Sequence, residues 1–182
     1  MIKKNKRLLQ RVRVPLGFVL SVAFLVFAEP RPLSLLVGGT IAVAGLLIRA
    51  WASGHIRKNQ TLAVSGPYAH TRNPLYLGSL ILGVGFCIAS GVWWLAAGFA
   101  VLFLGVYLPV MRVEAEDLTR LFGAEYEEYA RRVPLFFPSF RARKKTGVKF
   151  DFELYLRYRE YRAALGLLFA TAVLAFKAFY LR

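Results

Sequence analysis

The sequence contains few of the side chains that crosslink a protein or bind metal ions. Its 182 residues include one cysteine, Cys87, and two histidines, His55 and His70. A single cysteine excludes an intramolecular disulfide within this sequence and a cysteine-rich zinc site. Two histidines are too few to indicate a metal centre, so we expect no metal site.

Acidic residues are also scarce. The sequence has 10 Asp and Glu against 25 Lys and Arg, a formal net charge of +15, and 57% hydrophobic residues. This much apolar sequence excludes a disordered tail and is not typical of a basic nucleic-acid-binding module. The composition predicts an integral membrane protein whose positive charge sets its orientation and attracts membrane lipids, with no nucleic-acid partner.

Five apolar segments reach or approach the ~20 residues that a helix needs to cross the hydrocarbon core. They are residues 14–28, 33–51, 75–89, 92–111 and 163–181. The sequence thus predicts an all-α integral membrane protein with about five transmembrane helices. Only Ser90 and Gly91 separate the third segment from the fourth, which predicts a tight helical hairpin. The basic start also resembles a secretory signal, but the poor cleavage sequence around Pro30 favours a retained span.

Basic residues mark one side of the membrane. Lys and Arg gather in residues 1–13, 49–74 and 112–162. By the positive-inside rule these segments face the cytoplasm, and five spans place the carboxyl terminus outside. All acidic residues except Glu29 lie in residues 112–162. We therefore expect a multi-pass protein of a bacterial or archaeal inner membrane, with its active site facing the cytoplasm.

Three parts of the chain are predicted to differ in role. They are residues 1–48, a basic segment with two spans; residues 49–140, a functional core; and residues 141–182, a basic interfacial helix with the last span. Within the last part, residues 141–162 are predicted to form an amphipathic helix at the lipid surface. We expect Arg49 and Lys177 to reach the headgroups from the ends of their spans.

The loop between the second and third segments combines turn signals with polar side chains. Gly66 and Pro67 predict a turn, and Asn73 followed by Pro74 predicts the N-cap and first residue of a helix. The free N–H groups and positive dipole end of such a helix suit a carboxylate, and Arg72 lies beside them. The loop therefore predicts a binding site for an anionic ligand.

Residues 112–134 predict two cytoplasmic amphipathic helices. Apolar residues recur at helical spacing up to Phe122, and Gly123 suits a C-cap. A second, short helix then presents Tyr126 and Tyr129 one turn apart. We expect these helices to form part of a cofactor pocket.

A carboxylate lies close to the membrane boundary at the start of this stretch. Glu114 follows the apolar run that ends at Met111, and a carboxylate there is costly without a partner. Its partner is either a ligand or a neighbouring cation, Arg112 or Arg72. The sequence leaves both interpretations open.

These two stretches, separated by one hydrophobic hairpin, resemble a known family. The residues that match its motifs are Gly66-Pro67-Tyr68, Arg72-Asn73-Pro74-Leu75-Tyr76-Leu77-Gly78, Glu114-Ala115-Glu116-Asp117-Leu118, Phe122-Gly123, Tyr126, Tyr129 and Val133-Pro134. Over residues 49–140 the pattern resembles the isoprenylcysteine carboxyl methyltransferase family and its phospholipid methyltransferase relatives.

The resemblance implies an integral membrane enzyme that transfers a methyl group from S-adenosylmethionine to a lipophilic acceptor. The acceptor would be a small molecule or a lipidated partner that presents a carboxylate, a thiol or an amine. The residues that the resemblance assigns to the cofactor are Gln60, Thr61, Leu62, Ala63, Tyr68, Asn73, Pro74, Leu75, Tyr76 and Glu114. To these we add Arg72, because it precedes the helix start.

Three positions depart from the family pattern. Asn73 replaces a His, and Ala115 replaces the second Glu of a pair. Val110 stands four residues before Glu114, where the family has an Arg that contacts the substrate. We therefore expect Arg112, close by, to share the catalytic role with Glu114.

Two other functions stay open at this point. A membrane sterol or steroid reductase has a similar C-terminal region and uses NADPH, whose 2′-phosphate would suit Arg57 and Lys58. A non-catalytic membrane scaffold would use the loops only to cap helices. The methyltransferase hypothesis requires Asn73 and Glu114 to lie at the same membrane face, with portals between the start of the third span and the end of the fourth.

Overall fold

The computed structural model describes residues 2–58, 60–139 and 148–181, with side chains from residue 15 onward. In this part of the chain all regular elements are helical. The helices are α1 (Ile2–Phe27), α2 (Pro32–Ser53), α3 (Pro74–Ser90), α4 (Trp93–Leu102), α5 (Leu108–Phe122), α6 (Ala124–Arg132), α7 (Phe152–Arg157) and α8 (Tyr161–Tyr180). A 3-10 turn, η1 (Gly66–Ala69), precedes α3, and a π-helical turn, η2 (Phe103–Tyr107), joins α4 to α5.

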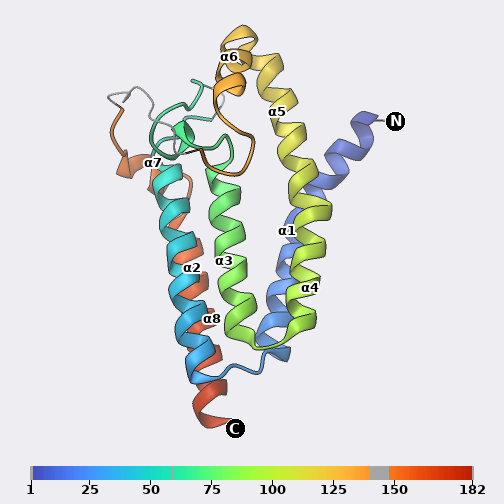
Figure 1. Ribbon diagram of the computed structural model, residues 1–182, viewed down its shortest axis with the longest axis vertical. Helices are drawn as coiled ribbons and strands as arrows, with labels where there is room; N and C mark the ends of the chain where they lie inside the picture. Colours follow the sequence, from blue (N-terminus) through green and yellow to red (C-terminus); the bar gives the residue numbers. More distant parts are fainter. Residues whose placement is uncertain (1, 59, 140–147, 182) are drawn as a thin grey trace.

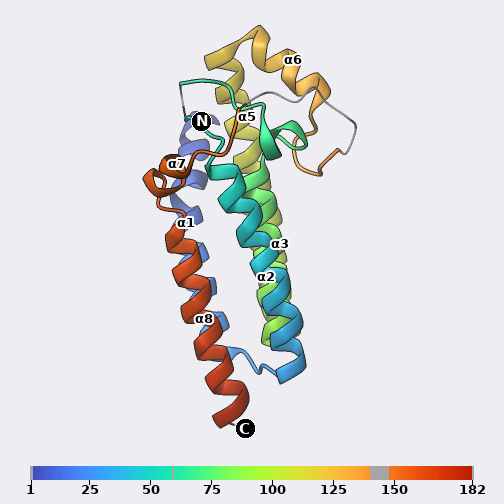
Figure 2. The ribbon, with the colours of Figure 1, turned by 90° about the vertical axis from the view of Figure 1, so that its left-hand side faces the viewer.

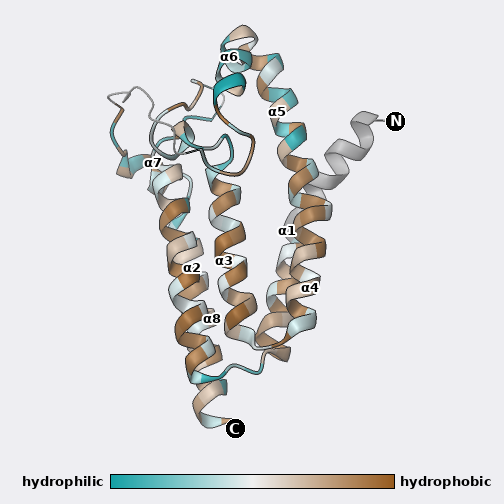
Figure 3. Ribbon diagram, viewed as in Figure 1, coloured by the Kyte–Doolittle hydropathy of each residue, from teal (hydrophilic) through white to brown (hydrophobic). Residues whose placement is uncertain are grey.

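Three helical runs are long and apolar enough to cross a membrane. They are α2, the continuous run from Trp93 to Phe122, and α8. The apolar part of α1 (Pro15–Phe27) and α3 are shorter. Figure 3 shows these helices as hydrophobic along most of their length, with polar residues gathered at one end. The all-α membrane class is thus confirmed, whereas the count of five spans stays a prediction.

The long helices lie roughly lengthwise beside one another, with the polar elements at one end (Figures 1 and 2). Helix α2 packs against α3 and α8, and α1 packs against α4 and α5. The loop before α3, the end of α5, α6 and α7 all gather at the polar end. The last described residues lie at the opposite end.

Helices α2 and α3 approach so closely that their backbones touch. A Cβ atom on Gly38 would collide with the Gly85 carbonyl oxygen, and one on Gly45 would collide with the Gly78 carbonyl oxygen and with Leu82. Small residues at such positions let two membrane helices gain van der Waals contact along their length. The pair therefore forms a firm base for the start of α3.

The predicted hairpin between α3 and α4 is confirmed. Gly91 ends α3 with a left-handed φ of 68°, a conformation that glycine adopts without strain. The Ser90 carbonyl oxygen accepts a hydrogen bond from the Glu29 backbone N–H (2.8 Å), which ties the hairpin to the α1–α2 connection.

Two predictions for the basic residues and segments near the last span are wrong. Lys177 does not reach outward: its Nζ donates to the carbonyl oxygens of Val26 (2.8 Å) and Leu25 (3.3 Å), at the exposed end of α1. The last carbonyl oxygens of a helix have no N–H donor within the helix and carry a partial negative charge. The Lys177 ammonium is therefore stabilised by donating hydrogen bonds to them. A continuous helix over 141–162 is also wrong, because α7 has only six residues and Arg159 turns the chain with a φ of 56°. Residues 141–147 of that segment lie outside the described residues.

Candidate functional site

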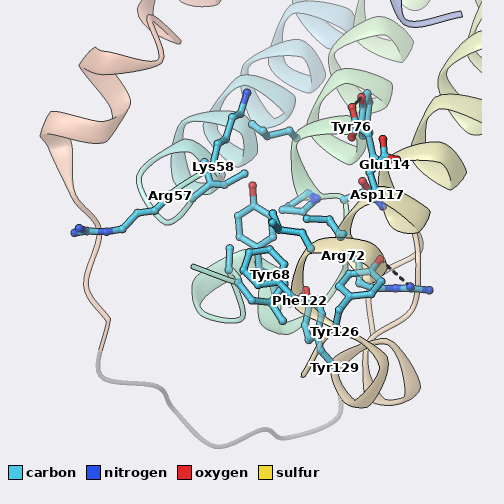
Figure 4. A pocket seen from close by; sticks show the side chains of 18 of the residues that line it. Arg57, Lys58, Tyr68, Arg72, Tyr76, Glu114, Asp117, Phe122, Tyr126 and Tyr129 are labelled. Atoms are coloured by element: carbon cyan, nitrogen blue, oxygen red, sulfur yellow. Dashed lines mark hydrogen bonds between the residues drawn. The ribbon is translucent and has the colours of Figure 1, made fainter. Parts of the chain in front are cut away.

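A cavity of about 1020 Å³ lies at the polar end of the helices (Figure 4). Its walls come from the end of α2, the loop that follows, the start of α3, the π-helical turn, helices α5 and α6, and Glu160 just before α8. The predicted cofactor residues on its lining are Thr61, Leu62, Ala63, Tyr68, Arg72, Asn73, Pro74, Leu75, Tyr76 and Glu114. Gln60 and Arg112 are exposed and are not among the lining residues.

The two stretches singled out in the sequence meet inside this cavity. The Tyr76 hydroxyl, on the first turn of α3, donates to Glu114 Oε1 on α5 at 2.8 Å. The Tyr76 ring also packs edge-on against Tyr107, in the π-helical turn, at 5.9 Å between centroids. Asn73 and Glu114 therefore lie on the same cavity, as the hypothesis of a shared site required.

The π-helical turn sets the direction of α5. Pro109 lacks a backbone N–H, so a regular helix cannot form the bond from residue 109 to the Gly105 carbonyl oxygen. The wider turn over Phe103–Tyr107 lies just before it, and π turns of this kind are frequent at functional sites. Tyr107, in this turn, lines the cavity, whereas Val110, four residues before Glu114, is fully buried.

The loop before α3 is held by the segment after α6. Thr71 is buried, and its hydroxyl donates to the Phe136 carbonyl oxygen at 2.7 Å. The Tyr129 hydroxyl donates to the Tyr68 carbonyl oxygen at 2.7 Å. Helix α6 and the segment after it therefore hold the backbone of the loop in place, while side chains of the loop line the cavity.

Asn73 occupies the predicted N-cap position, but its side chain does not cap α3. Its Nδ2 donates to the Leu135 carbonyl oxygen at 2.9 Å, so the side chain ties the loop to the segment after α6. Pro74 opens the helix as predicted. The first residues of α3 line the cavity and the N-cap side chain makes no capping hydrogen bond, an arrangement that favours an anionic ligand at the start of this helix.

Arg72 pairs with an aromatic ring. Its Nη1 donates to the Tyr126 hydroxyl at 3.1 Å, and its Cζ lies 5.7 Å from the centre of that ring. The Tyr76 hydroxyl donates to the Glu114 carboxylate, and a bound ligand or a cation as a further partner of this carboxylate both stay predictions. Arg112, the other cation considered, is exposed on α5.

Two buried donors in the cavity lack hydrogen-bond partners among the described residues. They are the Tyr68 hydroxyl and Arg72 Nε. Tyr68 is only 5% exposed, and burial raises the pKa of its phenol well above the usual value, so it stays a neutral donor. Figure 4 shows its hydroxyl between Lys58 on one side and Tyr76 with Glu114 on the other. An unpaired buried donor costs free energy, and a polar ligand in the cavity would remove that cost.

Sequence reasoning missed one polar cluster of the cavity wall. Arg49, expected to reach the headgroups, instead forms an ion pair with Glu160 at 2.8 Å and donates to Ser79 Oγ at 2.5 Å. The sequence does carry a signal for such a pair: an arginine lies near the end of one apolar span, and a glutamate lies just before another apolar span. Neither side chain belongs to the motifs that drew attention to the site.

No group of three or more His, Cys, Asp and Glu side chains that could hold a metal ion occurs in the described part of the chain. The polar groups of the cavity instead come from tyrosines, arginines and carboxylates on separate elements. Such a set of donors and acceptors suits an organic ligand with charged groups at both ends.

Comparison with known proteins assigns a family to this region. Residues 40–125 match the family described as phospholipid methyltransferase. The cobalt-zinc-cadmium resistance protein CzcN of Cupriavidus metallidurans is 40% identical over 140 residues, 69% of this chain and 61% of that protein. The nickel-cobalt-cadmium resistance protein NccN of Alcaligenes xylosoxydans is 38% identical over 105 residues, 57% of this chain and 47% of that protein. The chain thus spans about half to three-fifths of the length of these curated relatives. No solved structure matches it.

Proposed function

Because this chain belongs, through residues 40–125, to the phospholipid methyltransferase family, we propose that it transfers a methyl group from S-adenosylmethionine to a lipophilic acceptor at the cytoplasmic membrane surface. One observation carries the proposal beyond the family. Tyr68 and Arg72, whose side chains carry the two buried donors without a partner among the described residues, line the same cavity as Glu114 and the start of α3. Donors for an anionic group and a carboxylate for a cationic group are what an amino-acid-bearing sulfonium ligand requires.

The residues fit the cofactor in a specific way. The start of α3 and Arg72 would hold its carboxylate, Glu114 its ammonium, and the apolar residues Leu62, Ala63 and Leu118 its adenine. When bound, the cofactor supplies a methyl group activated by a positively charged sulfur. The protein side chains bind it, orient it and exclude water from it.

The chemistry asked of the protein depends on the acceptor. A carboxylate or a thiolate is already nucleophilic, so the site needs only to align the two reactants at roughly 3–3.5 Å. A protonated amine must first lose a proton to a base, and the carboxylates on the cavity wall are those of Glu114, Asp117 and Glu160. The proposal covers all three acceptor types.

The shape of the cavity supports access from two directions. Its lining continues from the exposed Arg57 and Lys58 to Ser79 on the second turn of α3 and Tyr107 in the π-helical turn. Arg57 and Lys58 lie in the loop that follows α2, whereas Ser79 lies within the apolar helix α3 and Tyr107 within the apolar run from Trp93 to Phe122. We therefore propose that the cofactor enters from water and the acceptor from the bilayer.

The direct test compares ligands on the purified full chain in detergent. S-adenosylhomocysteine is expected to raise the apparent Tm, whereas NADPH is not, although Arg57 and Lys58 line the cavity. Stabilisation by NADPH alone would assign the site to a reductase. A response to neither ligand would support a scaffold.

Transfer itself is tested in membranes that contain the protein. Methyl-tritiated S-adenosylmethionine is expected to label a species that organic solvent extracts, and the labelled species identifies the acceptor. Membranes that contain the Glu114→Ala variant are the control, because that variant lacks the carboxylate of the site. Equal labelling in both membranes would contradict the proposal.

Replacing Tyr68 by Phe is expected to change stability and binding in opposite directions. The variant loses a buried hydroxyl that has no partner, so the apparent Tm of the ligand-free protein is expected to stay the same or rise. The affinity for S-adenosylhomocysteine is expected to fall about fivefold to tenfold, because the ligand loses one hydrogen bond. Differential scanning fluorimetry and isothermal titration calorimetry measure the two effects. A lower Tm with unchanged affinity would show that the hydroxyl serves the fold alone.

A further inference from the structure

Three basic residues on the cavity wall are each held by the segment that precedes α8. Arg57 Nη2 pairs with Asp151 Oδ2 at 3.3 Å, and Lys58 Nζ lies 5.2 Å from the centre of the Tyr158 ring. The third is Arg49, which pairs with Glu160. The family match ends at residue 125, so these contacts join the matched domain to a segment outside it.

The Arg49–Glu160 pair is the best defined of the three contacts. Arg49 Nη2 donates to Glu160 Oε1 at 2.9 Å and Oε2 at 2.8 Å, and its Nε donates to Oε2 at 3.2 Å. The side chains are 23% and 13% exposed. An ion pair shielded in this way is held more firmly than an exposed pair, and it is costly to break from one side.

Arg49 passes this restraint to the start of α3. Its Nη1 donates to Ser79 Oγ at 2.5 Å and to the Leu75 carbonyl oxygen at 3.4 Å. Leu75 and Tyr76 belong to the first turn of α3, and Tyr76 donates to Glu114. A continuous chain of contacts therefore runs from Glu160 through Arg49 and the first turn of α3 to Glu114.

The local backbone at Glu160 is shaped for this contact. Arg159 has a φ of 56°, which is rare for a residue with a side chain and costs conformational free energy. Glu160 stands at the N-cap position of α8, yet its side chain makes no capping hydrogen bond and turns to Arg49 instead. The positive φ of Arg159 and the missing cap of α8 both cost local stability, and the chain has both features where Glu160 pairs with Arg49.

We propose that Glu160 is a positioning residue of the methyltransferase site, which acts through Arg49 to hold the first turn of α3 in the geometry that binds the cofactor. This inference rests on the proposed function. It extends the site beyond the family match to the segment 151–160, and it gives α8 a role besides crossing the membrane.

The test separates a positioning role from a merely structural one. Glu160→Met leaves the Arg49 charge without its carboxylate, so both the apparent Tm and the affinity for S-adenosylhomocysteine are expected to fall, the affinity about tenfold. In the double variant Arg49→Met/Glu160→Met the uncompensated charge is gone, so the Tm is expected to recover. The affinity is expected to stay about tenfold low, because the hydrogen bonds from Arg49 to Ser79 and to the Leu75 carbonyl oxygen are then absent.

Glu128→Met is the matched control, because Glu128 forms an exposed ion pair with Arg132 outside this cavity. It is expected to leave the affinity unchanged. If the double variant of Arg49 and Glu160 binds S-adenosylhomocysteine like the unmodified protein, the pair serves stability alone and the proposal is overturned.

A second measurement does not depend on the ligand. Hydrogen exchange of the peptide that spans residues 74–82 is expected to be faster in both Glu160→Met and the double variant than in the unmodified protein and in Glu128→Met. Unchanged exchange in both variants would overturn the positioning role. If the unmodified protein bound no adenosyl compound, the proposed function would fail, while the exchange result would still decide whether Glu160 holds α3.

Discussion

Replacing Glu114 by Gln is expected to weaken the binding of S-adenosylhomocysteine by about tenfold to a hundredfold. The amide keeps an oxygen that can accept the hydrogen bond from Tyr76, so the packing of α3 against α5 is preserved. The variant loses the negative charge that we assign to the ammonium group of the cofactor. Isothermal titration calorimetry with the purified protein measures the change.

Glu116→Gln is the matched control for this variant. Glu116 lies on the same helix, is exposed and does not line the cavity, so its loss of charge is expected to leave the affinity unchanged. Equal affinities for Glu114→Gln and the unmodified protein would remove Glu114 from the binding site. A large loss of affinity in Glu116→Gln as well would show that binding depends on the total charge of α5 and not on Glu114 in particular.

Replacing Gly38 by Ala is expected to lower the free energy of unfolding by about 3 kcal/mol. The added methyl group would collide with the Gly85 carbonyl oxygen and with Ala89, so α2 and α3 must move apart along their length. Because the start of α3 carries part of the cavity wall, ligand affinity is expected to fall as well. Thermal unfolding in detergent, followed by circular dichroism, reports the loss of stability.

Gly39→Ala provides a control one residue away on the same helix. A Cβ atom at Gly39 would have no neighbour within 4 Å. Alanine favours a helix over glycine by about 1 kcal/mol, so this variant is expected to be as stable as the unmodified protein or slightly more stable. Similar losses in both variants would mean that the close contact between α2 and α3 is not what makes glycine necessary at residue 38.

Much of the fold could be predicted from the sequence because membrane helices follow hydropathy. The apolar segments, the Gly91 turn and the Gly123 break all follow from local composition and turn chemistry, and each appears where it was expected. The proximity of Tyr76 and Glu114 could also be predicted, because the short hairpin between α3 and α4 brings the end of the second helical run back to the membrane face where α3 begins. The segments and turns depend on neighbours in sequence, and the contact of Tyr76 with Glu114 follows from the hairpin between them.

The features that the sequence did not predict depend on contacts between distant segments. Lys177 and Arg49 both lie near the ends of apolar spans, where water or headgroups normally receive the charge. Each finds a partner on another helix instead: carbonyl oxygens of α1 for Lys177 and Glu160 for Arg49. Asn73 likewise turns from its own helix to Leu135. Only the packed arrangement of the helices decides between a local and a distant partner.

The run of 30 residues from Trp93 to Phe122 also fixes the height at which the proposed reaction takes place. At a rise of ~1.5 Å per residue, Glu114 lies about 32 Å along this run from Trp93, close to the ~30 Å depth of the hydrocarbon layer. If the run crosses the layer along the membrane normal from Trp93, this length places the Glu114 carboxylate level with the glycerol and headgroup zone. Under the proposed function, a lipid acceptor would keep its tail in the leaflet while its polar end is methylated, and turnover would require no extraction of the lipid from the membrane.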